Sequence, residues 1–148
     1  MILECTAITE YLNSQDGKPV VTGRTAKECA AMHMMQRRTE AGLLDAAGAY
    51  FHHAAAGPGP DIETYRNGDW GRKQGERAVA TMRTLDGELA GRACRACMGD
   101  DEFTMADLSA MPGLFYSDFA KIETPPELPH LAAWCARVNA RPRVAATA

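Results

Sequence analysis

The sequence predicts an all-α protein, a bundle of five or six helices around one buried helix. Apolar residues recur at steps of three and four along most of the chain, and two segments open with the residues of a helix capping box. No convincing second strand follows the apolar stub at the start. At 148 residues, 46% of them hydrophobic, the chain is long enough for one domain with a buried core.

The first fifteen residues combine a strand-like stub with a short helix. Met1–Leu3 is an apolar triplet, and a strand end of this kind needs a partner strand, which suggests that a segment is missing upstream. A helix is expected over residues 5–14, before the turn-forming run Asp-Gly-Lys-Pro. Its apolar positions on one face are Ala7, Ile8, Tyr11 and Leu12.

Two long helical stretches occupy the middle of the chain. Thr25 precedes Glu28 by three residues, the capping-box spacing, so a helix is expected to begin there. Helical spacing without proline continues to residue 54, interrupted near Thr39 and Gly42, which predicts one long helix or two nearly continuous ones. After a linker rich in glycine and proline, a second long helix is expected over residues 70–90. We expect Asp69 to cap that helix and Gly91 to end it.

The last two helices are predicted from a second capping box and a closing apolar pattern. Thr104 and Asp107 have the capping spacing ahead of a helix over residues 105–119. That helix is apolar nearly all round and is expected at the centre of the bundle, with Pro112 kinking it or ending its first half. A final helix is expected over 127–140, its inward residues being Leu128, Leu131, Trp134 and Val138.

Composition excludes several classes of partner. The formal net charge is -3 and charges of both signs are interspersed, so nucleic acid and anionic membranes are poor candidates. No apolar run approaches the ~20 residues of a membrane-spanning helix, and Glu4 interrupts a signal-peptide pattern, so we expect a cytoplasmic protein. Five cysteines, an odd number, favour reduced thiols over a disulfide framework.

Cys94 and Cys97 form a CxxC spacing that allows three interpretations. The pair could be a redox dithiol or half of a zinc site. The strand that precedes a redox CxxC is absent, and the nearest further ligands, His130 and Cys135, are distant in sequence. Incidental thiols in a loop are therefore favoured, and no metal site is predicted.

Three segments resemble motifs of the glutathione transferase family, in that family's order. ECTAITEYL resembles its ESxAIxxYL segment, FTMADLSAM its FTxAD segment, and PHLAAWCARVNARP its closing PxLxxWxxRVxxRP helix. QRRTEAGLL also looks like the first helix of the C-terminal domain in bacterial members. The resemblance implies a remnant of a thioredoxin-like domain over residues 1–15, a linker over 16–24 and an all-helical C-terminal domain over 25–148.

The resemblance also implies where glutathione would bind. Glu4 and Cys5 match the Glu and Ser that hold the γ-glutamyl residue, although the thiol of Cys5 is a weaker donor than a hydroxyl. The Tyr, Ser or Cys that contacts the glutathione sulfur belongs to the N-terminal part of the thioredoxin-like domain. No catalytic residue is therefore expected in this chain.

Further roles follow from the same resemblance. The first long helix lines the electrophile site in the family, which makes its residues candidates there, with a core role as the favoured alternative for the methionines and the tyrosine. These candidates are Met34, Met35, Arg38 and Tyr50. Thr104 and Asp107 take the family's folding role, which is to cap the buried helix.

The implied function is conjugation of glutathione, the co-substrate, to electrophilic small molecules in detoxification. The complete protein is expected to be a homodimer, and this chain alone is expected to be inactive because the N-terminal catalytic half is absent. The alternative is a non-catalytic helical module that joins other proteins together.

Overall fold

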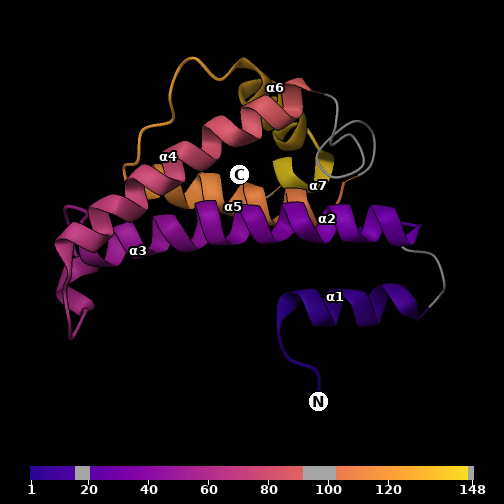
Figure 1. The fold of residues 1–148 in the computed structure, drawn as a ribbon, viewed down its shortest axis with the longest axis horizontal. Helices are drawn as coiled ribbons and strands as arrows, with labels where there is room; N and C mark the ends of the chain where they lie inside the picture. The colour runs from indigo at the N-terminus through magenta and orange to yellow at the C-terminus, as the bar shows by residue number, and fades with distance from the viewer. Residues whose placement is uncertain (16–20, 92–102, 147–148) are drawn as a thin grey trace.

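The computed structural model describes residues 1–15, 21–91 and 103–146, and these residues form helices and no strand (Figure 1). The all-α prediction is confirmed. In chain order the elements are α1 (Cys5–Ser14), α2 (Ala26–Thr39), the π-helical turn η1 (Glu40–Leu44), α3 (Asp45–His53), the short 3₁₀ helix η2 (Gly59–Ile62), α4 (Gly68–Ala90), α5 (Met105–Phe119), α6 (Pro129–Asn139) and α7 (Pro142–Ala145).

One nearly continuous helix, α2–η1–α3, forms the base of the bundle (Figure 1). The capping box predicted at its start is present: the Glu28 backbone NH donates to Thr25 Oγ1 at 3.2 Å, and the Thr25 NH donates to Glu28 Oε2 at 3.1 Å. The interruption expected near Gly42 is the π-helical turn η1. Gly42 is needed there because a Cβ would lie 2.5 Å from Thr81 Oγ1 of α4, so the glycine allows the two helices to approach closely.

Helix α4 crosses above this base and contacts α3, η1 and α6. It begins two residues before the predicted start, and the cap predicted at Asp69 is wrong. Asn67 is the cap instead, because its Oδ1 accepts a hydrogen bond from the Trp70 NH at 3.0 Å. Asp69 instead contacts the guanidinium of Arg72 one turn later.

Helix α5 packs against α2, η1 and α3, and it runs on through Pro112 to Phe119. Gly113 permits this packing, since a Cβ there would lie 2.9 Å from Leu43 Cγ. Helix α5 was expected at the centre of the bundle, but it is not covered on every side, because three large residues on its outer surface are exposed. These are Leu108 (39%), Phe115 (74%) and Phe119 (55%).

The core lies between α2–η1–α3, α4, α5 and α6. Helix α6 contributes the inward residues expected from its spacing, with Trp134 only 1% exposed. The other members of the core come from α2, η1, α3, α4, α5, α6 and the loop after α5, and include Met35, Leu43, Ala46, Ala47, Ala78, Met82, Leu85, Ala106, Ala110, Ile122, Leu131 and Val138.

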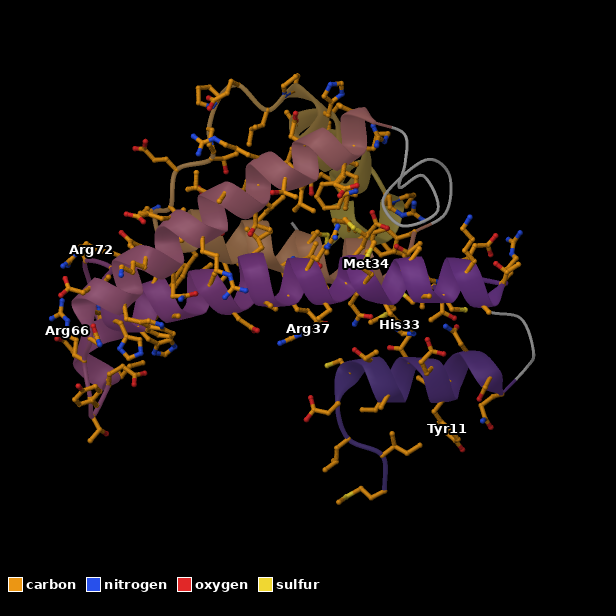
Figure 2. All side chains as sticks on the ribbon, viewed as in Figure 1. Tyr11, His33, Met34, Arg37, Arg66 and Arg72 are labelled. Atoms are coloured by element: carbon orange, nitrogen blue, oxygen red, sulfur yellow. The ribbon has the colours of Figure 1, made fainter. Side chains whose placement is uncertain are left out.

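Helix α1 lies outside this core, below α2 (Figure 1). None of its residues is buried, and the apolar face predicted from its spacing is exposed, with Tyr11 at 50% and Leu12 at 62%. Figure 2 shows Tyr11 on the side of α1 away from α2. Within the described residues, no helix is long and apolar enough to cross a membrane.

Candidate functional site

The first turn of α1 carries the residues predicted to hold glutathione. Glu4 precedes the helix with a positive φ of 73°, and the Ile8 NH donates to its carbonyl oxygen at 3.0 Å. A non-glycine residue held in this region costs about 1–3 kcal/mol, and such strain concentrates at functional sites. The Glu4 side chain makes no capping hydrogen bond within the described residues, so the first NH groups of the helix remain available to a ligand.

Cys5 is the first residue of α1, and its thiol is free and exposed. Glu4 is exposed beside it. The structure therefore brings together a carboxylate, a thiol and a helix N-terminus with its partial positive charge. This arrangement can hold a group that carries both a carboxylate and an ammonium.

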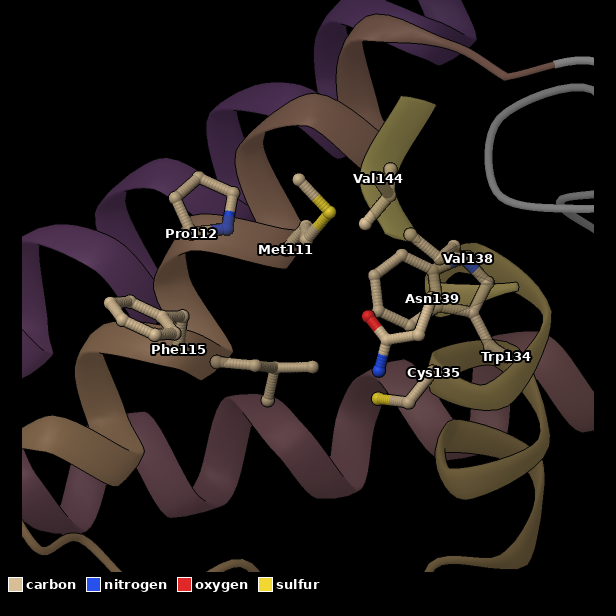
Figure 3. Close-up of a pocket in the computed structure, with 9 residues that line it drawn as sticks. Met111, Pro112, Phe115, Trp134, Cys135, Val138, Asn139 and Val144 are labelled. Carbon is tan, nitrogen blue, oxygen red and sulfur yellow. The ribbon is translucent and has the colours of Figure 1, made fainter. Parts of the chain in front are cut away.

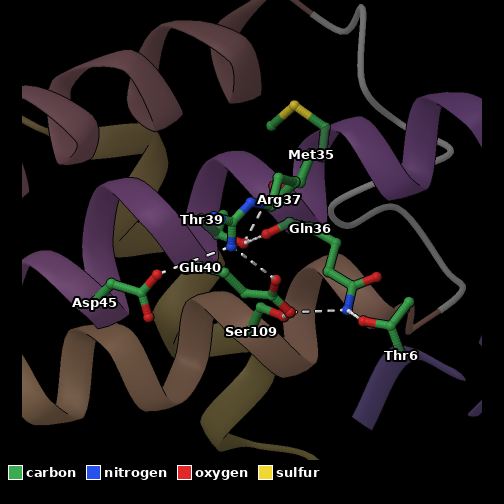
Figure 4. Close-up of polar contacts among 8 residues, drawn as sticks. All are labelled: Thr6, Met35, Gln36, Arg37, Thr39, Glu40, Asp45 and Ser109. Atoms are coloured by element: carbon green, nitrogen blue, oxygen red, sulfur yellow. Dashed lines mark hydrogen bonds and ion pairs between the residues drawn. The ribbon is translucent and has the colours of Figure 1, made fainter. Parts of the chain in front are cut away.

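A polar cluster at the start of α1 links that turn to two other helices (Figure 4). Gln36 Nε2 of α2 donates to Thr6 Oγ1 at 2.7 Å and to Glu40 Oε1 of η1 at 2.9 Å. Ser109 of α5 donates to the same Glu40 oxygen at 3.3 Å. Gln36 is 2% exposed, and within the described part of the chain its Oε1 has no hydrogen-bond partner. The cluster therefore fixes the first turn of α1 relative to the bundle.

The four predicted electrophile residues do not form one site. Met34 and Arg38 line a groove of about 550 Å³ between α2, η1 and α4, with Arg37, Arg77 and Thr81. Met34 lies on the α4 side of α2, whereas α1 lies on the other side (Figure 2). Arg38 is held in that groove by Glu88, with Nη1 and Oε1 3.2 Å apart.

The other two candidates lie elsewhere. Met35 is 1% exposed and belongs to the core, in agreement with the core role that was the favoured alternative for it. Tyr50 is half-buried against Gly75, where a Cβ would lie 2.8 Å from its Cδ2. It lines a second groove, of about 410 Å³, between α3 and α4.

An apolar pocket between α5, α6 and α7 was not predicted from the sequence (Figure 3). Its volume is about 440 Å³, and its walls include Phe115, Trp134, Cys135 and Val144. Burial raises the pKa of the Cys135 thiol, so this group stays protonated at neutral pH. No sequence signal indicated this pocket, because the helical spacing of Phe115 does not show whether another element covers that residue.

Asp107 performs the predicted capping role and one further role. Its Oδ2 accepts hydrogen bonds from the Thr104 NH at 2.9 Å and from Thr104 Oγ1 at 2.8 Å. Its Oδ1 accepts from the indole Nε1 of Trp134 at 2.8 Å, which joins α5 to α6. The residue is 1% exposed, and burial raises the pKa of its carboxyl despite these donors.

Residues 1–15, 21–91 and 103–146 contain no group of three or more His, Cys, Asp or Glu side chains that could hold a metal ion. Cys94 and Cys97 lie outside the described residues.

Comparisons with known proteins agree with the arrangement of these helices. A family profile for the glutathione S-transferase C-terminal domain matches residues 73–142. The curated glutathione S-transferase 2 of Saccharomyces cerevisiae is 42% identical over 144 residues, which are 97% of this chain and 60% of the yeast protein. The chain therefore spans less than two thirds of that relative's length.

Solved structures give the same result. Gtt2 of Saccharomyces cerevisiae superposes with a TM-score of 0.88 at 41% identity, over 99% of this chain and 69% of the yeast chain. A glutathione S-transferase domain-containing protein of Marinobacter aquaeolei gives 0.83 at 49% identity, over 97% and 68% of the two chains. A theta-class enzyme of Xanthomonas axonopodis, solved with glutathione bound, gives 0.69 at 25% identity, over 99% and 74%. The chain belongs to the glutathione S-transferase family.

Proposed function

We propose that the protein conjugates the thiol of glutathione to an electrophilic small molecule, and that this chain supplies the γ-glutamyl end of the glutathione site and the helical domain. The observation that carries the proposal is the uncapped, strained first turn of α1 at Glu4 and Cys5. The α-carboxylate of the γ-glutamyl residue would accept hydrogen bonds from the first NH groups of α1. The carboxylate of Glu4 would pair with its ammonium.

By family resemblance, activation of the thiol is assigned to a residue in the N-terminal part of a thioredoxin-like domain. Residues 1–15 would form the end of that domain and residues 25–148 the helical domain. We also propose a cytoplasmic, homodimeric enzyme that acts in detoxification.

Turnover measurements test the proposal. The 148-residue chain, fused to the part of the Marinobacter relative that lies outside the aligned 68% of that protein, is assayed with glutathione and a chloro-dinitrobenzene. The fusion is expected to show glutathione-dependent conjugation.

Two variants of the fusion separate glutathione binding from folding. Glu4→Gln removes the charge proposed to face the ammonium and should raise the KM for glutathione, with little effect on the KM for the electrophile. Glu63→Gln, a matched change far from α1, should leave both constants unchanged. A folded fusion without conjugation would refute the proposed function.

A further inference from the structure

We propose that the apolar pocket between α5, α6 and α7 binds a second small molecule, which is uncharged, largely apolar and carries one hydroxyl or carbonyl group. The pocket is separate from the first turn of α1, so this inference does not depend on the proposed function. Figure 1 shows α6 and α7 on one side of α2–η1–α3 and α1 on the other side. A ligand in the pocket and a ligand at α1 therefore occupy different places.

The pocket has the size and the rigidity of a small-molecule site. Its volume is about 440 Å³, and sites for small molecules enclose about 300–1,000 Å³. Trp134 is 1% exposed, and its indole Nε1 donates to Asp107 Oδ1 at 2.8 Å, so the ring is held in one orientation. The wall formed by α6 is thus fixed before a ligand arrives, which lowers the entropy cost of binding.

The opposite wall, formed by α5, presents apolar surface that no described element covers. Phe115 is 74% exposed although it is a large apolar side chain. Met111 of α5 and Val144 of α7 continue the apolar lining and are only partly buried. A flat apolar molecule placed between these side chains and Trp134 would remove their surface from water, which is the main driving force for binding such a molecule.

The absence of charge in the lining selects the class of ligand. None of the described residues that line the pocket is charged. An ionised group buried against apolar walls without a partner is strongly disfavoured, so the ligand is uncharged. The groove between α2, η1 and α4 differs in this respect, because Arg37, Arg38 and Arg77 line it.

Two polar side chains of α6 give the ligand one polar end. Cys135 and Asn139 are one helical turn apart, and Figure 3 shows both side chains pointing from α6 toward α5. The amide of Asn139 can donate a hydrogen bond to a carbonyl oxygen or accept one from a hydroxyl group, whereas a thiol is a weak donor. A hydroxyl or carbonyl group of the ligand is therefore expected beside Asn139, with the apolar part toward Phe115 and Trp134.

NMR of the 148-residue chain with 1-naphthol, which is flat, uncharged and carries one hydroxyl group, tests the proposal. We expect a saturable shift of the indole NH signal of Trp134 and none for Trp70, which is 44% exposed in the first turn of α4 and does not line the pocket. A Trp70→Phe variant assigns the two signals. Naphthalene-1-sulfonate has the same rings and a negative charge, and it should bind at least about tenfold more weakly.

Three variants locate the site by calorimetry. Phe115→Ala should weaken binding of 1-naphthol about tenfold, because it removes one wall. Phe119→Ala is the matched control, since it makes the same change in the same helix at a 55% exposed position outside the pocket, and it should leave the affinity unchanged. Asn139→Ala should weaken 1-naphthol about two- to tenfold and leave naphthalene unaffected. All three residues are exposed, so the variants should keep the fold.

Four results would overturn the proposal: an unshifted Trp134 signal, equal affinity for 1-naphthol and the sulfonate, equal losses in Phe115→Ala and Phe119→Ala, or binding by the 148-residue chain that disappears in the fusion protein. In the last case the added part of the fusion, and not a small molecule, would cover the pocket. Glutathione is absent from these measurements, so their outcome is independent of the conjugation test.

Discussion

Replacing Asp107 by alanine should destabilise the protein strongly, because one carboxylate satisfies three donors at the junction of α5 and α6. The substitution removes the acceptor of the Thr104 NH, of the Thr104 hydroxyl and of the Trp134 indole. Thr104 is 7% exposed and Trp134 is 1% exposed, so water cannot easily replace the lost acceptor. The hydroxyl can rotate to another acceptor, but the two NH groups cannot.

The magnitude follows from these two NH groups. A buried donor left unpaired costs about 1–3 kcal/mol, and part of that cost is offset because the variant no longer buries a carboxylate. We therefore expect a loss of about 3 kcal/mol in the free energy of unfolding. For a chain of this size, that corresponds to a thermal midpoint lower by about 6–12 °C.

Thermal and urea unfolding, followed by circular dichroism at 222 nm, measure this change. Asp118→Ala is the matched control, since it makes the same substitution in the same helix at an exposed position and should change stability by less than about 0.5 kcal/mol. Trp134→Phe should cost less than Asp107→Ala, because it leaves the Thr104 contacts intact. If the Asp107→Ala and Asp118→Ala proteins had the same free energy of unfolding, the reasoning would be refuted.

Three more predictions follow from the described side chains. Because burial raises the pKa of Asp107, the part of its stabilising contribution that comes from the raised pKa is present below the ordinary carboxyl pKa and decreases as the pH rises through the raised value, while its hydrogen bonds to Thr104 and Trp134 remain. Urea unfolding should therefore show a larger difference between wild type and Asp107→Ala at pH 4 than at pH 7. Iodoacetamide should label exposed Cys5 faster than Cys135, whose thiol pKa is raised by burial, and mass spectrometry should find similar rates in urea. In the fusion protein, Cys5→Ser should tighten glutathione binding about two- to tenfold by calorimetry, because a hydroxyl is the better donor.

The helices themselves could be predicted because their signals are local. Each capping box lies within four residues, and both Thr25 with Glu28 and Thr104 with Asp107 form their reciprocal contacts. The cap of α4 was missed because Asn67 and Asp69 are both good capping residues two positions apart. Only the backbone conformation distinguishes them, and sequence does not encode it locally.

The surroundings of each helix could not be predicted, because periodicity identifies an apolar face without identifying its neighbour. The apolar face of α1 is exposed, and its polar stripe, from Thr6 to Asn13, faces α2. Helix α5 is likewise open along Phe115 and Phe119. Whether such a face is buried or exposed depends on which element packs against it.

The same limit applies to the candidate site. Glu4 and Cys5 could be found from a short motif, but Ser109 joins Glu40 from 69 residues away, and no spacing rule links them. The electrophile candidates on the first long helix share a helix without sharing a face. Met34 and Arg38 face α4, Met35 faces the core, and Tyr50 lines a separate groove.

Backbone NMR of the fusion protein during a glutathione titration tests the central claim most directly, namely that the first turn of α1 binds the γ-glutamyl end. Helix α4 supplies an internal control, because Asn67 already caps its first turn, whereas among the described residues Glu4 makes no side-chain cap on α1. We predict large, saturable shifts of the amides of Cys5 and Thr6 and none for Trp70 at the start of α4. Saturable binding of glutathione that leaves the amides of Cys5 and Thr6 unshifted would contradict the account.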